Sequence, residues 1–116
     1  MFFEILGTTY KIERKRFEEE DVFERISGYC CSFCKKIVTC DLSTDPKYKI
    51  ATAEELANAE KETLRHEIIH AFFNESGLKG NANDYEGSWV ENEEMVDWIA
   101  LQFPKMNRVF KEVGCL

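Results

Sequence analysis

Basic residues are scarce in this sequence. Its 116 residues include 15 Lys and Arg against 22 Asp and Glu, which gives a net charge of −7. A phosphate backbone or an anionic lipid surface binds basic patches that are large enough to overcome such an excess. We therefore expect that neither nucleic acid nor a membrane is a partner of this chain.

Long apolar runs are missing as well. No stretch of the sequence approaches the length that spans a bilayer. The first residues, MFFEILG, lack the basic flank and the long apolar segment of a signal peptide. These absences predict a cytoplasmic protein.

Five cysteines are present, and an odd number cannot all pair within one chain. In a cytoplasm we expect them to be reduced thiols that serve as small apolar residues. Cys31 and Cys34 have the CxxC spacing of a structural zinc site or a redox pair, and this stays an alternative for the group Cys30, Cys31, Cys34 and Cys40. Cys115 lies one residue from the end, in a tail that we expect to be frayed.

The length suits a single domain, residues 1–116, with a small core. A hydrophobic content of 44% with nine phenylalanines predicts a packed globule. Residues 1–50 have mainly the pattern of strands, and the rest has the pattern of helices. This order predicts an α+β domain, with helices packed on one small antiparallel or mixed sheet.

The strand signals are local. Residues 2–7 and 8–17 flank a Gly-Thr-Thr break, and the second segment alternates apolar and charged residues. β-branched, aromatic and cysteine residues predict a strand pair over residues 28–42, with a turn near 32–36. Residues 18–26 fit either a short helix or a strand, and this choice stays open.

A long helix is predicted over residues 52–76. Thr52 and Glu55 have the spacing of a capping box, in which the hydroxyl and the carboxylate satisfy free backbone N–H groups at a helix start. Apolar residues then recur at intervals of four. Gly77 can adopt the left-handed conformation that ends helices.

Two further helices are predicted near the C-terminus. Ser88 and Glu91 repeat the capping-box spacing, which predicts a helix over residues 89–103. Pro104 should end that helix and suits the first turn of a short helix over residues 104–113.

The stretch LRHEIIHAFF contains both histidines of the chain. On a helix, His66 and His70 lie about 6 Å apart on one face, so both imidazoles can reach a single metal ion. Glu67 follows the first histidine and can stand near the ion without binding it, which is where a base must stand to take a proton from water. The alternative is two histidines that are buried by chance.

Two histidines leave a catalytic zinc one protein ligand short, and the sequence has no third histidine. A carboxylate must fill the position. The predicted second helix offers Glu91, Glu93, Glu94 and Asp97. Glu93 and Asp97 are one turn apart on the same face, so one could bind the ion and the other could orient a histidine. The alternative is a solvated acidic face.

Together, HEIIH (66–70) and NEEMVD (92–97) resemble the motifs of the gluzincins, thermolysin-like zinc peptidases, and especially of the small minigluzincins. The chain is also similar to short metallopeptidase-like proteins of bacteria and phages. The resemblance covers residues 52–102. It implies a zincin-like fold in which a small N-terminal sheet packs on the active-site helix.

By this resemblance the Zn²⁺ ligands are His66, His70 and Glu93. Glu67 is then the general base, and Asp97 supports His66. The implied activity is hydrolysis of peptide bonds in a peptide or protein substrate.

The sequence departs from the family at the oxyanion site. The family places a tyrosine between the motifs and a histidine after them to stabilise the oxyanion. Here Tyr85 is the candidate tyrosine, and the later histidine is missing. The family also pairs extended substrate with an edge strand of the sheet, for which we expect residues 37–42.

Two other interpretations remain open. In one, the chain is a non-catalytic zinc-containing module of phage or mobile-element origin that binds a protein partner. In the other, no metal binds, and His66 and His70 bond to core groups while Glu93 faces solvent.

Overall fold

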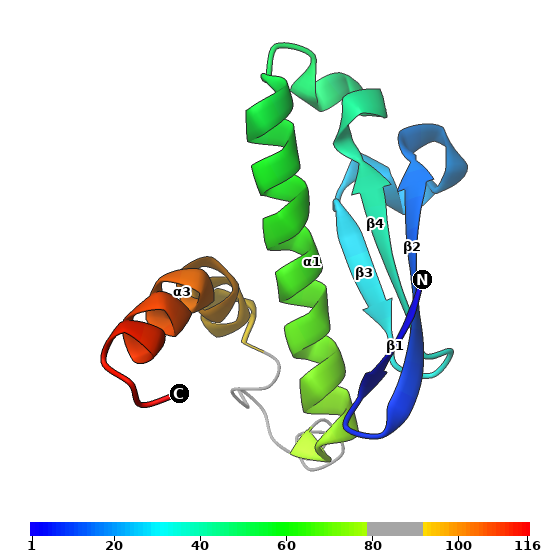
Figure 1. Ribbon diagram of the computed structural model, residues 1–116. Helices are drawn as coiled ribbons and strands as arrows, with labels where there is room; N and C mark the ends of the chain where they lie inside the picture. The colour runs from blue at the N-terminus through cyan, green and yellow to red at the C-terminus, as the bar shows by residue number, and fades with distance from the viewer. Residues whose placement is uncertain (79–91) are drawn as a thin grey trace.

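The computed structural model describes residues 1–78 and 92–116. These residues form an α+β fold with a four-stranded mixed sheet and two long helices (Figure 1). The strands and helices are β1 (Phe2–Ile5), β2 (Thr8–Arg16), β3 (Gly28–Cys31), β4 (Lys36–Asp41), α1 (Ala53–Glu75) and α3 (Glu93–Glu112). The α+β class and the strand-rich first half are as predicted.

The strand order is β1-β2-β4-β3. β1 pairs antiparallel with β2 through a turn at Leu6 and Gly7, which both have positive φ. β2 and β4 are parallel, and β3 and β4 form the predicted antiparallel pair. The expectation that residues 37–42 form an edge strand is therefore wrong, because β4 has partners on both sides. Within residues 1–78 and 92–116, β3 is the edge strand at that end of the sheet.

Short 3₁₀ helices connect the strands. Residues 18–26, whose type was open, contain the end of one such helix, η1 (Phe17–Glu19), and the whole of another, η2 (Asp21–Glu24). η3 (Leu42–Thr44) and η4 (Pro46–Tyr48) lead from β4 toward α1. Phe23 of η2 is fully buried against Val38.

The N-terminus of α1 has the predicted capping box. Thr52 Oγ1 accepts from the backbone N–H of Glu55, and Glu55 Oε2 accepts from the N–H of Thr52, both at 3.1 Å. The helix ends before Gly77, which has a φ of 87°. Both ends of α1 could therefore be predicted from residues that are close together in the sequence.

One face of α1 packs on the sheet. Ala71, together with the partly buried Leu64 and Ile68, meets Tyr10 and Ile37. Because this face of α1 is buried against the sheet, only the opposite side of the helix is left for contacts with other elements.

The C-terminal end of α1 is fixed to the sheet by Glu75. Its carboxylate accepts from Thr8 Oγ1, Tyr10 Oη and Lys35 Nζ, at 2.9, 2.7 and 2.6 Å. The hydrogen bonds from Lys35 and Tyr10 lower the pKa of Glu75 to about 2. These contacts fix the last turn of the helix to the β1–β2 and β3–β4 ends of the sheet.

The start of α3 differs from the prediction. Asn92 has extended backbone and its Oδ1 accepts from the N–H of Met95, so the helix begins at Glu93 and not at residue 89. Ser88 and Glu91 lie outside the described residues. Asparagine is as favourable an N-cap as serine, so the capping-box spacing of Ser88 and Glu91 could not exclude a helix start after Asn92.

Pro104 does not end α3, so the prediction of a separate helix over residues 104–113 is wrong. The helix continues to Glu112, and Gly114 follows it with a φ of 73°. Proline has no N–H for the carbonyl four residues earlier, which here belongs to the buried Ala100. Arg65 Nε of α1 donates to that carbonyl at 2.6 Å. The neighbouring helix supplies the missing hydrogen bond.

Cys31 and Cys34 form a disulfide across the β3–β4 turn, which corrects the expectation of reduced thiols and leaves neither sulfur free for a metal. Cys40 is buried, as expected of a small apolar residue, and Cys30 is partly buried. Cys115 is exposed.

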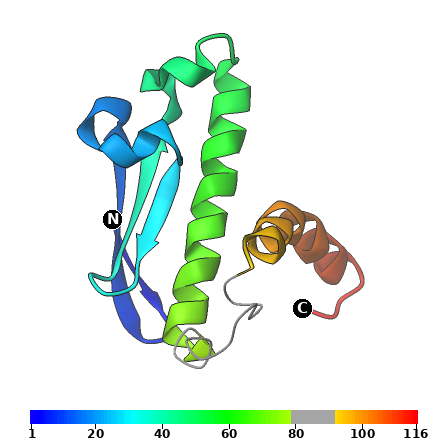
Figure 2. The same ribbon diagram turned by 180° about the vertical axis from the view of Figure 1, so that it is seen from behind.

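The fold therefore has three layers. α1 lies between the sheet and α3, as the two opposite views show (Figures 1 and 2). None of the helices among the described residues combines the length and the apolar character of a membrane span.

Candidate metal centre

His66, Glu67 and His70 project from the middle of α1 and form a group that could hold a metal ion. Each offers one ligand atom, and these atoms lie within 4.8 Å of one another. The two Nε2 atoms face each other at 3.1 Å. The i, i+4 spacing of the histidines gives the geometry that the sequence predicts.

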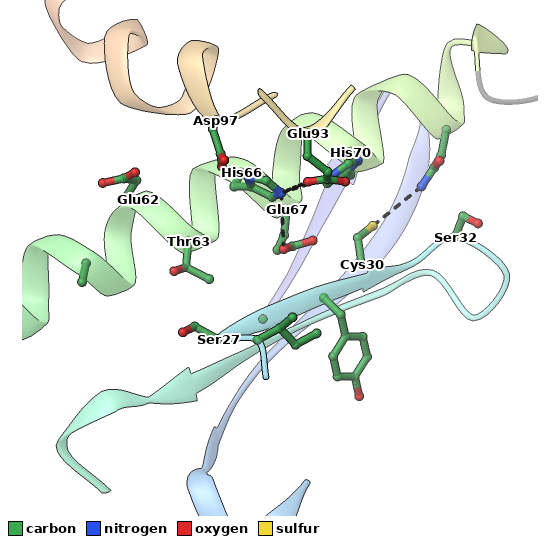
Figure 3. Close-up of a pocket in the computed structure, with 15 residues that line it drawn as sticks. Ser27, Cys30, Ser32, Glu62, Thr63, His66, Glu67, His70, Glu93 and Asp97 are labelled. Carbon is green, nitrogen blue, oxygen red and sulfur yellow. Dashed lines mark hydrogen bonds and ion pairs between the residues drawn. The ribbon is translucent and has the colours of Figure 1, made fainter. Parts of the chain in front are cut away.

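Glu93, the first residue of α3, lies against both imidazoles. Its Oε2 is 2.9 Å from His66 Nε2, and its Oε1 is 3.2 Å from His70 Nε2. Figure 3 shows these three side chains together where α3 meets α1. The alternative without a metal expected the histidines to bond to core groups and Glu93 to face solvent; the Glu93 side chain is 65% exposed, but its carboxylate contacts both histidines.

Asp97 lies one turn further along α3 and fixes the orientation of His66. Because an ionised carboxylate only accepts hydrogen bonds, His66 Nδ1 donates to Asp97 Oδ1, at 2.6 Å. The proton on Nδ1 leaves a lone pair on Nε2, which points at His70 and Glu93. A metal ligand needs this tautomer.

The three donor atoms fit a tetrahedral zinc. Bonds of about 2.0–2.1 Å at tetrahedral angles separate two ligand atoms by about 3.3 Å. The observed separations are 3.1 Å between the two Nε2 atoms, and 2.9 and 3.4 Å from Glu93 Oε2 to His66 Nε2 and His70 Nε2. Shifts of a few tenths of an ångström would bring all three into range.

Glu67 occupies a different place from Glu93. It is only 7% exposed, and its nearest oxygen is 3.9 Å from His66 Nε2. Its side chain points away from Glu93, into the space between α1 and β3 (Figure 3). Burial, reinforced by Glu93 and Asp97 and opposed by His66, raises the pKa of Glu67 to about 7. A carboxylate with such a pKa can take up and release a proton near neutral pH.

A cavity of about 660 Å³ lies between α1 and the edge strand β3. His66, Glu67, His70, Glu93 and Asp97 all line it. The volume is typical of pockets that hold small ligands or short peptide segments. The candidate metal centre therefore faces open space from which a substrate can enter.

Gly28 allows β3 to approach α1 at this point. A Cβ on Gly28 would lie 2.8 Å from Thr63 Cγ2 and 3.0 Å from the Val38 carbonyl oxygen, and 3.6 Å from Glu67 Cγ. The first distance is too short for a side chain, and the second is a tight contact with the backbone. Glycine thus lets the edge strand run directly beside Glu67.

Asn74 and Cys30 are among the residues that line the cavity without having been predicted as site residues. Asn74 follows His70 by four residues, so the spacing that relates the histidines could have found it. Its Nδ2 donates weakly to Cys30 Sγ, at 3.7 Å. Burial, with a contribution from Glu67, raises the pKa of the Cys30 thiol to about 12. A neutral thiol is a poor nucleophile, which argues against cysteine chemistry.

Tyr85 and Glu91 lie outside the described residues. The structure therefore does not place the predicted oxyanion donor or the first of the four candidate carboxylates. Tyr29 lines the cavity, but its hydroxyl donates to Glu20, at 3.0 Å.

Comparisons of this chain with protein family models, with curated proteins and with solved structures give no match.

Proposed function

We propose that the chain is a gluzincin-like zinc peptidase, which hydrolyses peptide bonds with water and with Glu67 as the general base. One observation carries the proposal. Glu93 lies within 3.2 Å of the Nε2 atoms of both His66 and His70, although it is 23 residues from the second histidine. The result is a group of two imidazoles and one carboxylate that leaves the fourth position of a tetrahedral site for water.

His66, His70 and Glu93 would hold the Zn²⁺. When bound, zinc lowers the pKa of water to roughly 7 and polarises a substrate carbonyl. Asp97 keeps His66 in the tautomer whose Nε2 lone pair faces the ion, as its hydrogen bond to Nδ1 indicates.

Glu67 would take a proton from the attacking water and pass it to the leaving amine. Its buried position at the cavity supports both steps, because a carboxylate shielded from bulk solvent beside the bound substrate can accept the proton and return it. Its distance from the histidines, greater than that of Glu93, supports its assignment as base and not as ligand.

Extended substrate would pair with β3. In the described part of the chain this strand pairs with β4 alone, and its residues Gly28, Tyr29 and Cys30 line the cavity. An added peptide strand uses such an unpaired edge. The role that we expected of residues 37–42 therefore passes to β3 in this proposal.

Metal analysis and one isosteric variant test the proposal. The purified protein should contain one zinc per chain and cleave casein or a peptide library. Glu67→Gln should keep the zinc and lose hydrolysis, by a factor of about 100 or more. Glu54→Gln, an exposed position at the start of the same helix, is the matched control and should keep both. Equal activity of wild type and Glu67→Gln would reject the peptidase.

A second function is favoured by one observation. Tyr29, the tyrosine that lines the cavity among the described residues, directs its hydroxyl to Glu20 and not to the centre. Without an oxyanion donor, the zinc would be structural, in a module that binds a protein partner. In that case wild type would bind zinc tightly and cleave nothing.

A further inference from the structure

A second cavity lies beside the metal centre. It has a volume of about 580 Å³, and it is lined by Glu62 of α1 and by Glu94, Asp97, Trp98 and Leu101 of α3, among others. Glu62 and Asp97 also line the first cavity, so the two spaces adjoin. We call this second space the side cavity.

The side cavity is acidic. Glu62, Glu94 and Asp97 line it, and no Lys or Arg of the described residues does. Asp97 accepts a hydrogen bond from His66, whereas no described residue bonds or pairs with Glu62 or Glu94. A divalent ion in the metal centre would be balanced by the charges of Glu93 and Asp97. Glu62 and Glu94 would still lack a cation.

The side cavity also has an apolar wall. Trp98 is 56% exposed and Leu101 is 46% exposed, although both are large apolar residues. An indole face attracts an ammonium or guanidinium group, and apolar surface covers the methylene stem that carries such a group. A bare inorganic cation would use the carboxylates but leave this wall uncovered.

We infer that the side cavity binds the side chain of a Lys or Arg residue in a peptide, close to the scissile bond. Glu62 precedes His66 by four residues, so it lies one helical turn, about 6 Å, from the metal centre along α1. Glu62 and Glu94 bind the cation, and Trp98 and Leu101 pack on the stem. The inference rests on the proposed function, for which it supplies a substrate class.

Peptides that are acetylated at the N-terminus and amidated at the C-terminus test the inference by hydrolysis. Each position near the cleavage site is occupied in turn by lysine, arginine, norleucine or citrulline. We expect kcat/KM to be about tenfold higher for lysine or arginine than for the uncharged analogues at one position. Glu62→Gln with Glu94→Gln should abolish this ratio. Glu54→Gln with Glu112→Gln, which removes two exposed charges elsewhere, should preserve it.

Hydrolysis without a preference for a cation, or a preference that survives in the Glu62→Gln, Glu94→Gln variant, would overturn the inference and leave the peptidase intact. A requirement for a free N-terminus would also overturn it, because the cation would then be the α-ammonium group.

A binding measurement separates the inference from the proposed function. Trp89→Phe leaves Trp98 as the single tryptophan, since the chain has two. In the zinc-loaded Glu67→Gln, Trp89→Phe protein, acetylated lysine peptides should change Trp98 fluorescence, and norleucine peptides should not. If wild type cleaves nothing and this response appears, the peptidase fails and the cation site stands. An equal response to both peptides would overturn the site.

Discussion

Arg65 of α1 should stabilise the docking of α3, because Pro104 has no backbone N–H to donate to the carbonyl oxygen of Ala100. Ala100 is fully buried, and its carbonyl oxygen receives the Arg65 Nε at 2.6 Å in place of a backbone N–H. Arg65→Met keeps most of the aliphatic stem but removes the donor. The buried carbonyl would then be unsatisfied.

The size of the effect follows from the type of hydrogen bond. A bond that involves a charged group contributes about 1.5–3 kcal/mol, so Arg65→Met should lower the free energy of unfolding by about 2 kcal/mol. Pro104→Ala restores an N–H within α3. In that background the carbonyl keeps a partner, and Arg65→Met should cost about 1 kcal/mol less than in wild type.

Urea unfolding followed by far-UV circular dichroism measures all four corners of this double-mutant cycle. Lys61→Met, an exposed position one turn earlier on α1, is the control and should change stability by less than about 0.5 kcal/mol. The reasoning fails if Arg65→Met costs the same in both backgrounds, because Pro104 would then have no part in the role of Arg65.

Three further predictions concern the centre and its surroundings. Glu93→Gln should weaken zinc binding by more than about 100-fold in competition with a chelating dye, whereas Glu94→Gln should leave it nearly unchanged. Because the folded pKa of Glu67 is about 7 and its ordinary value is 4.5, the unfolded state loses this proton first as the pH rises. The free energy of unfolding of the metal-free protein should therefore fall by about 3 kcal/mol between pH 4.5 and 7, and Glu67→Gln should lack that fall in urea titrations. Gly28→Ala should cost about 1–3 kcal/mol in the same assay, and Thr63→Ser, which removes the clashing Cγ2, should recover part of it; no recovery would mean that Thr63 is not the obstacle.

The features of the centre that could be predicted depend on short spacings. Four residues on one helix bring His66 and His70 together, and four on another bring Glu93 and Asp97 to one face. The sequence does not give the angle at which the two helices cross. A zinc site with two histidines needs a third ligand, however, and one acidic segment of the sequence offers carboxylates for it. The proximity of Glu93 to the histidines in the structure agrees with that requirement.

Two of the errors concern contacts between residues far apart in the chain. Pro104 is a helix breaker by local rules, and the residue that satisfies Ala100 lies 35 positions earlier. The inner position of β4 depends on parallel pairing with β2, across a connection whose pattern was ambiguous. Neither contact leaves a local signal. Asn74 is a different case. Its spacing of four residues from His70 can be read in the sequence, but only the structure shows that it lines the cavity.

The two helices contribute unequally to the centre, and this inequality has a physical consequence. α1 is packed on the sheet along its length, so His66, His70 and Glu67 are positioned before any ion arrives. α3 buries only Val96 and Ala100 completely, while Phe103 and Val109 remain exposed. Much of what holds α3 in place is therefore polar, namely the hydrogen bond from Arg65 to the Ala100 carbonyl and the hydrogen bond from His66 to Asp97. An ion shared between the histidines of α1 and Glu93 of α3 would add its binding free energy to the contact between the two helices. Assembly of the centre and docking of α3 are then one equilibrium, so a change that loosens α3 weakens metal binding even when every ligand is intact.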